Sequence, residues 1–176
     1  MNRRAAVLIV DDHAANRLAY QAVLERDYAV FLADSGPRAL DVARREELSV
    51  ILLDIRMPEM DGFETATLLR RRYKTRYTPI VFMSAIHQTP THVSQGFVVG
   101  ATDYLFTPVD PDFLRFKVGV YAEMFRRNEA LRLQAERLGQ LIRSLRADFD
   151  SVPESQAKVR RLEGILSELQ RQAAPN

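Results

Sequence analysis

Short apolar runs alternate with segments of helical pattern through most of the chain. The apolar runs, each predicted to form a strand, are residues 5–10, 28–33, 50–53, 79–83 and 103–106. The segments predicted to form helices between them are residues 13–26, 34–47, 61–73 and 91–99. Strands that are apolar throughout are typical of a parallel sheet covered by helices on both faces. The pattern therefore predicts an α/β domain with a doubly wound sheet of five strands.

Beyond Asp110 the chain changes to long helical segments. Asp110 is followed by proline, which is typical of a helix start, and no further proline interrupts the helix predicted over about 111–150. Ser151 and Glu154 have the spacing of a capping box, which predicts a second helix over about 152–172. This second helix either folds back on the first or extends it as a kinked stalk.

The first long helix carries two series of residues that recur every seven positions, as in a coiled coil. Most of these residues are apolar. The polar Asn128 lies at a position where asparagines from two paired helices fix the register of a coiled coil. We therefore predict a parallel homodimer joined through the helix from about 112 to 150. The residues of this predicted seam are Tyr121, Asn128, Ala135, Ile142 and Phe149 in one series and Met124, Leu131, Leu138 and Leu145 in the other.

The composition excludes several classes of protein and of chemical site. The chain has 176 residues and a formal net charge of +2, so it is not a nucleic-acid-binding polycation as a whole. The absence of cysteine excludes a disulfide scaffold, cysteine-ligated metals and a thiol nucleophile. The first apolar run ends at Asp11, too early for a signal peptide. We therefore expect a cytoplasmic protein that does not insert into a membrane.

Aspartates follow two of the predicted strands. Asp11 and Asp12 come after the first strand, Asp54 comes after the third, and Ser84 closes the fourth. The carboxyl ends of parallel strands meet at one edge of the sheet, where ligands bind. Carboxylates gathered there repel one another unless a hard cation is present, and oxygen ligands favour Mg²⁺. The alternative is that each aspartate only caps the helix that follows it.

In this order, these residues resemble the receiver domain of bacterial two-component response regulators. The resemblance also includes the loop 57–62, Ala85 after Ser84, and the segment 100–108. It implies a flavodoxin-like sheet with strand order 2-1-3-4-5. We expect a receiver domain over residues 1–122 and a helical coiled-coil extension over residues 123–176.

The resemblance also implies a phosphoacceptor site. The residue matching Asp54 accepts a phosphoryl group from a histidine kinase or a phosphotransfer protein. The residues matching Asp11 and Asp12 hold Mg²⁺ together with Asp54 and the backbone carbonyl of Arg56. A receiver of this kind is a signalling domain and not an enzyme. A dehalogenase-type phosphatase is disfavoured, because it needs a second aspartate where Arg56 stands, and the chain has no nucleotide-binding P-loop.

In the receiver family two residues respond to phosphorylation, and this chain has residues that match both. At a third position that contacts the phosphoryl group, the chain differs from the family. The hydroxyl matching Ser84 binds a phosphoryl oxygen, and the aromatic residue matching Tyr104 swings inward when that hydroxyl moves. Thr107 stands where the family has a lysine that pairs with the phosphoryl oxygens. Arg56 is a candidate replacement for the missing charge. The alternative is an atypical receiver that acts unphosphorylated as an adaptor.

The helical extension limits the possible outputs. It is too short for a winged-helix domain or a nucleotide cyclase, and no histidine after His92 is available for phosphotransfer. We expect a dimerising extension that binds a downstream protein partner. One alternative is a helical output that contacts nucleic acid through arginines such as Arg126 and Arg132. Another is that the chain is the N-terminal part of a larger regulator or hybrid kinase.

Overall fold

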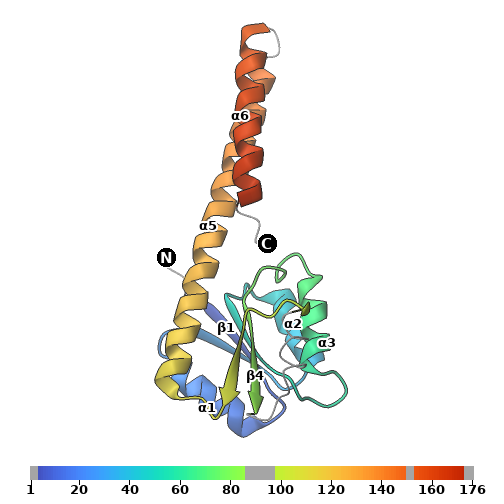
Figure 1. The fold of residues 1–176 in the computed structure, drawn as a ribbon, viewed down its shortest axis with the longest axis vertical. Helices are drawn as coiled ribbons and strands as arrows, with labels where there is room; N and C mark the ends of the chain where they lie inside the picture. Colours follow the sequence, from blue (N-terminus) through green and yellow to red (C-terminus); the bar gives the residue numbers. More distant parts are fainter. Residues whose placement is uncertain (1–3, 86–97, 150–152, 173–176) are drawn as a thin grey trace. The chain divides into compact units, whose positions relative to one another are not determined.

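The computed structural model describes residues 4–85, 98–149 and 153–172. The chain divides into two compact units, residues 1–125 and 126–176. The first unit contains a parallel sheet in the order β2-β1-β3-β4-β5 (Figure 1), which confirms the predicted fold and strand order. Its strands are β1 (Ala6–Val10), β2 (Ala29–Ala33), β3 (Val50–Asp54), β4 (Ile80–Ala85) and β5 (Asp103–Thr107).

Helices follow the strands, and two of them begin at aspartate caps. The helices are α1 (Ala14–Leu24), α2 (Gly36–Arg45), α3 (Gly62–Arg70), α5 (Pro111–Phe149) and α6 (Pro153–Gln172). The Asp110 carboxylate accepts hydrogen bonds from the backbone N–H groups of Asp112 (3.0 Å) and Phe113 (2.9 Å). Asp61 accepts one from the N–H of Glu64 at 2.8 Å. These caps satisfy N–H groups that have no partner within the helix.

The start of α2 has no such cap. Ser35 lies at its N-cap position, and its hydroxyl donates to the Asp34 carboxylate (3.0 Å) instead of accepting a bond from the helix. The helix predicted over 91–99 falls mostly outside the described residues, as does Ser151 of the predicted capping box.

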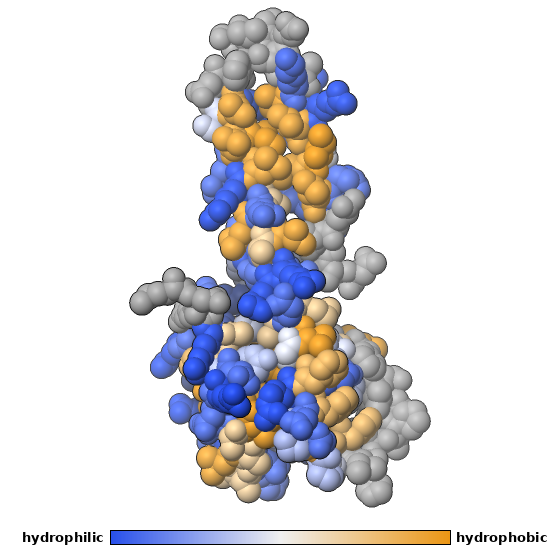
Figure 2. Space-filling model, turned by 90° about the vertical axis from the view of Figure 1, so that its left-hand side faces the viewer, coloured by the Kyte–Doolittle hydropathy of each residue, from blue (hydrophilic) through white to orange (hydrophobic). Residues whose placement is uncertain are grey.

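The second unit is a helical hairpin, formed by α6 and the part of α5 from residue 126 onwards. The helix α6 folds back along α5 (Figure 1) and does not extend it as a stalk. Ile142 packs against Val159 and Leu166, and Arg146 forms an ion pair with Glu163 at 2.7 Å. Hydrophobic residues also gather on one outer face of the hairpin (Figure 2). Within the described residues, no helix is both long and apolar enough to cross a membrane.

The predicted dimer seam is not one open stripe in this structure. In a two-stranded coiled coil, both series of the heptad face the partner. Here Ile142 is buried and Ala135 partly buried in the contact with α6, so neither faces a second copy. Tyr121 donates a hydrogen bond to Asp103 inside the first unit. The remaining seam residues with described side chains are partly buried (Leu145) or exposed (Met124, Asn128, Leu131 and Leu138), while the side chain of Phe149 is not described.

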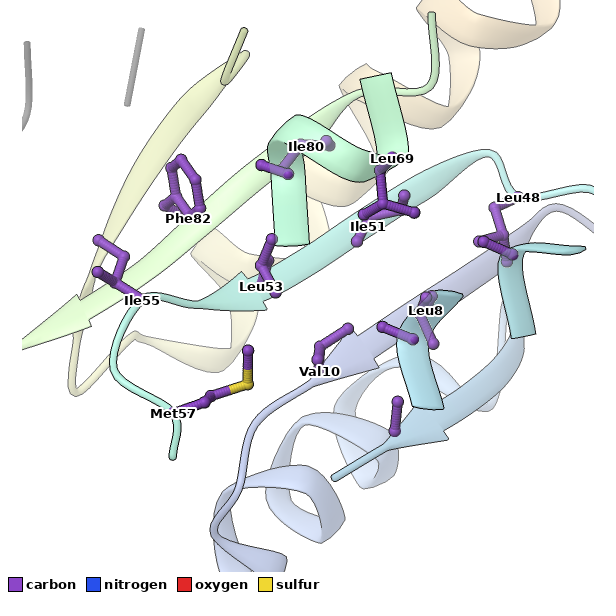
Figure 3. Close-up of a cluster of buried hydrophobic side chains, with 14 of the residues drawn as sticks. Leu8, Val10, Leu48, Ile51, Leu53, Ile55, Met57, Leu69, Ile80 and Phe82 are labelled. Carbon is purple, nitrogen blue, oxygen red and sulfur yellow. The ribbon is translucent and has the colours of Figure 1, made fainter. Parts of the chain in front are cut away.

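Successive residues of the central strands fill two core layers. One layer, drawn in Figure 3, packs strand residues such as Leu8, Leu53 and Phe82 against α2 and α3. The other packs their neighbours, such as Val7 and Leu52, against α1 and the first turns of α5. Side chains of a strand alternate between the faces of the sheet, so burial of both faces requires continuous apolar runs. This packing positions the carboxyl ends of β1, β3 and β4 at one edge.

Candidate functional site

The strand register brings the predicted site residues to neighbouring positions. Val10 pairs with Leu53, so Asp11 and Asp54 follow at the same level of β1 and β3. Asp54 pairs in turn with Met83, which directly precedes Ser84 in β4. The residues predicted from strand ends therefore share one edge of the sheet.

Asp11 is held by the first turn of α1. Its carboxylate is 3% exposed and accepts hydrogen bonds from the backbone N–H of His13 (2.8 Å) and the side-chain amide of Asn16 (2.9 Å). The Arg17 guanidinium donates to the backbone carbonyl of Asp11 at 2.6 Å. Asn16 and Arg17, in the first turn of α1, therefore hold Asp11 in position. The strand pattern in the sequence does not predict this role.

Asp12 and His13 complete an oxygen- and nitrogen-rich group beside Asp11. The His13 Nδ1 lies 2.8 Å from an Asp12 carboxylate oxygen. One ligand atom from each of Asp11, Asp12 and His13 lies within 4.8 Å of the other two. The His13 side chain is exposed, whereas Asp12 is partly buried. Histidine was not predicted to belong to the site.

The charge of Asp54 is coupled to the other two aspartates. The pKa of the Asp54 carboxyl is raised from 3.8 to about 6, first by burial and then by the negative charge of Asp11. The backbone N–H groups of Ile55 and Arg56 lower this pKa, and the charge of Asp12 raises it again. The site therefore carries more negative charge than its surroundings neutralise.

Tyr20 of α1 also lies close to this charge. Burial, together with the charges of Asp11 and Asp54, raises the pKa of its phenol to about 12. Tyr20 follows Asn16 by four residues, so both lie on the same face of α1. This spacing is the sequence signal that places Tyr20 at the site.

The loop after β3 returns closely to the strand. A Cβ on Gly62 would lie 2.3 Å from the backbone oxygen of Asp54 and 2.8 Å from the Cα of Ile55. The Gly62 N–H donates to the carbonyl of Ile55 at 2.9 Å. Only glycine fits at this approach, which explains its place in the loop motif.

The predicted switch residues Ser84 and Tyr104, and Thr107 at the family's lysine position, lie on β4 and β5. Ser84 is buried, and Thr107 is partly buried and pairs with Ala85, the residue after Ser84. The Tyr104 ring is buried in the core with its centroid 5.4 Å from that of Phe82. Tyr104 thus occupies the inward position in this structure.

A polar network joins β5 to α5. The Asp103 carboxylate accepts hydrogen bonds from Lys117 (2.7 Å), from the Tyr121 hydroxyl and from the N–H of Tyr104 (2.8 Å). Burial raises the pKa of Asp103, but these hydrogen bonds outweigh it and hold the pKa below its ordinary value. The network attaches the strand of Tyr104 directly to the long helix. Sequence reasoning missed it, because Lys117 and Tyr121 carry no signal of a partner in β5.

The residues present suit a magnesium ion. The donors are carboxylate oxygens whose mutual repulsion raises the pKa of Asp54, and a divalent cation would remove that repulsion. Asp11 and Asp12 lie close enough to share one ion. The Arg56 side chain, the candidate replacement for the missing lysine, is exposed.

Comparison with known proteins identifies the family to which this chain is similar. The family profile of the response regulator receiver domain matches residues 7–118. The response regulator PleD of Caulobacter vibrioides is 38% identical over 115 residues, which are 65% of this chain and 25% of PleD. The chain spans at most half the length of the curated relatives that it matches first.

Solved structures extend the comparison to the fold and the site. The chemotaxis protein CheY4 of Vibrio cholerae is 32% identical with a TM-score of 0.64, over 66% of this chain and 98% of that one. The receiver domain of the sensor histidine kinase PA1611 of Pseudomonas aeruginosa is 26% identical with a TM-score of 0.62, over 68% of this chain and 98% of that one. In that structure a magnesium ion is coordinated in the active-site cleft. With its sheet order, its edge of carboxylates and these matches, the chain belongs to the family of response regulator receiver domains.

Proposed function

We propose that Asp54 accepts a phosphoryl group from a histidine kinase or a phosphotransfer protein and that the helical extension passes the signal on. The observation that carries the proposal is the position of Asp54, which ends β3 beside Asp11 and has a pKa raised by burial and by its acidic neighbours. A carboxylate with a raised pKa in a cluster of like charges is typical of a functional site.

In the proposed transfer, an Asp54 carboxylate oxygen forms a bond to phosphorus while the bond from phosphorus to the donor's histidine nitrogen breaks. The electron pair of the broken bond stays on that nitrogen, and the product is an aspartyl phosphate. The protein's contribution is positioning, since Asp54 is fixed at a strand end and the buried Ser84 hydroxyl is the proposed donor to a phosphoryl oxygen.

Asp11, Asp12 and Asp54 are the proposed magnesium ligands, together with the backbone carbonyl of Arg56. When bound, Mg²⁺ would neutralise negative charge on the carboxylates and the transferred group. Asp11 reaches this position because Asn16 and the His13 N–H orient its carboxylate. Asp12 is less constrained, since its carboxylate contacts the exposed His13.

Intact mass after incubation with acetyl phosphate and Mg²⁺ tests the assignment. We expect one added phosphoryl group, which disappears in Asp54→Asn and in the presence of a chelator. The matched control is Asp34→Asn, which removes an exposed aspartate after β2 and should leave the phosphorylation intact. A phosphoryl group that remains in Asp54→Asn would contradict the proposal.

The second candidate is a receiver that acts unphosphorylated, and Thr107 is the residue that favours it. A neutral threonine pairs with Ala85 beside Ser84, where the family has a cation. The loss of a charge near 4 Å removes up to about 4 kcal/mol of attraction at an effective dielectric of 20. We expect phosphorylation to couple weakly to Tyr104 in the wild type, whereas Thr107→Lys should strengthen the response to beryllofluoride. A large wild-type response at Tyr104 would exclude this candidate.

We assign the helical extension to assembly and to contact with a downstream protein partner. The support is the hairpin itself, which leaves large apolar side chains exposed. Contact with nucleic acid is less favoured, because several arginines of the extension pair with glutamates, as Arg132 does with Glu129 (2.8 Å) and Glu136 (3.6 Å). The match spans only 25% of the length of PleD, so a longer regulator with a further output domain is an alternative that we keep.

A further inference from the structure

The hairpin has an apolar face that no described residue covers. The side chains between its helices, Ile142, Val159 and Leu166, are buried. A second stripe lies next to this contact on each helix and is 36–57% exposed. We call it the open face. It consists of Leu131, Leu138 and Leu141 on α5 and of Leu162, Ile165 and Leu169 on α6.

Helical geometry places both stripes on the same side of the hairpin. Leu138 lies four residues before the buried Ile142, and Leu162 lies four residues before the buried Leu166. A step of four residues turns by about 40° around a helix. The same turn on two antiparallel helices leads to the same side of their contact. Figure 2 agrees, since it shows hydrophobic residues gathered into one surface on a face of the hairpin.

The extent of this surface suits an interface between proteins. With these exposed fractions, the open face presents roughly 500 Å² of apolar side chain, near the upper end for a patch on a monomer. A stable interface buries about 800 Å² on each partner, and the polar residues that border the stripe would supply the difference.

We propose that the open face binds the open face of a second copy, so that two hairpins form a four-helix bundle. Similar leucine and isoleucine stripes on two antiparallel helices are complementary to themselves about a two-fold axis. The bundle also covers the apolar surface that the hairpin cannot bury alone. Leu131 and Leu138 of the predicted seam stay in the interface, whereas Ile142 belongs to the core within each chain. This inference rests on the part of the proposed function that assigns the extension to assembly, and it does not require phosphorylation.

Light scattering of the full chain at micromolar concentration tests the proposal. We expect a wild-type dimer. Leu141→Glu and Ile165→Glu each bury two unpaired charges in the dimer and should raise its dissociation constant at least about 100-fold. Circular dichroism checks that both variants keep their helical content, because both positions are more than half exposed in one chain.

Leu133→Glu is the matched control, because Leu133 is also an exposed leucine of α5 but lies outside the open face. It should leave the dimer intact, and so should Asp54→Asn. A monomeric wild type, a dimer in both open-face variants, or a monomer in Leu133→Glu would overturn the proposal. A dimer that accepts no phosphoryl group would contradict only the phosphorylation of Asp54.

Discussion

The receiver unit and the hairpin bury their apolar residues to very different extents. In the receiver, strand side chains such as Leu8, Leu52 and Phe82 have no exposed surface, and helices cover both faces of the sheet. In the hairpin, three described side chains are buried, whereas seven large apolar side chains, Leu131, Leu133, Leu138, Leu141, Leu162, Ile165 and Leu169, are exposed.

This difference indicates where each unit obtains its stability. A sheet between two helical layers forms a complete core within one chain. Two helices have one contact between them, so a broad apolar stripe on each helix remains partly in water. The receiver therefore folds on its own contacts, while the hairpin leaves apolar surface in water that the proposed dimer would cover. The following substitutions test the contrast, and most pair one unit with the other.

The largest expected effect is the loss of a core side chain. Phe82 packs against Phe63 and Tyr104, with ring centroids 5.1 and 5.4 Å away. Phe82→Ala should lower the free energy of unfolding of the receiver by about 3 to 5 kcal/mol. Ile142→Ala should cost about 2 kcal/mol in the hairpin, at the low end for an isoleucine, because the site between two helices can collapse around the smaller side chain. Urea unfolding followed by circular dichroism measures both, and equal losses would contradict the contrast.

Two glycines should respond in opposite directions. Gly62→Ala places a Cβ against backbone of β3 and should destabilise the receiver by about 2 to 3 kcal/mol. Gly164→Ala has nothing within 4 Å of its new Cβ and should stabilise α6 by about 0.5 to 1 kcal/mol. Thermal unfolding of the two variants provides the comparison. A stabilising Gly62→Ala would show that the loop does not approach β3 so closely.

At the site, the receiver should gain stability when a charge is removed. The pKa of Asp54 is raised from 3.8 to about 6, so its ionised form destabilises the metal-free fold above pH 6. Asp54→Asn should then raise the free energy of unfolding by about 1 to 2 kcal/mol at pH 8, allowing for solvent screening. The gain should decrease as the pH falls through 6 and vanish below about 4. Unfolding in chelator at several pH values tests this, with Asp34→Asn as control.

The smallest expected effects come from polar contacts. Asp103→Asn weakens the bonds to Lys117 and Tyr121 and should cost under about 1 kcal/mol, because the carboxylate is partly solvated. The pKa of Asp103 is lowered, so this contribution is present at neutral pH and is lost as the pH falls below about 4. Glu163→Gln removes the exposed ion pair with Arg146 and should cost at most about 0.5 kcal/mol. A larger loss in Glu163→Gln would show that this pair organises the hairpin.

The sequence alone was sufficient for the sheet and for the acidic edge. Strands buried on both faces require continuous apolar runs, so β1, β3 and β4 are visible in the residue pattern. Asp11 and Asp54 follow such runs directly, and parallel strands bring their carboxyl ends together without further information.

Only the tertiary structure decided which contacts use the remaining side chains. A heptad pattern identifies a stripe but not its partner, and in the folded chain Ile142 packs against α6 of the same hairpin. Asp103 and Lys117 are fourteen residues apart and meet because β5 and α5 pack side by side. These contacts depend on how separate elements pack against one another. Residue periodicity shows only which residues share a face of one helix or strand.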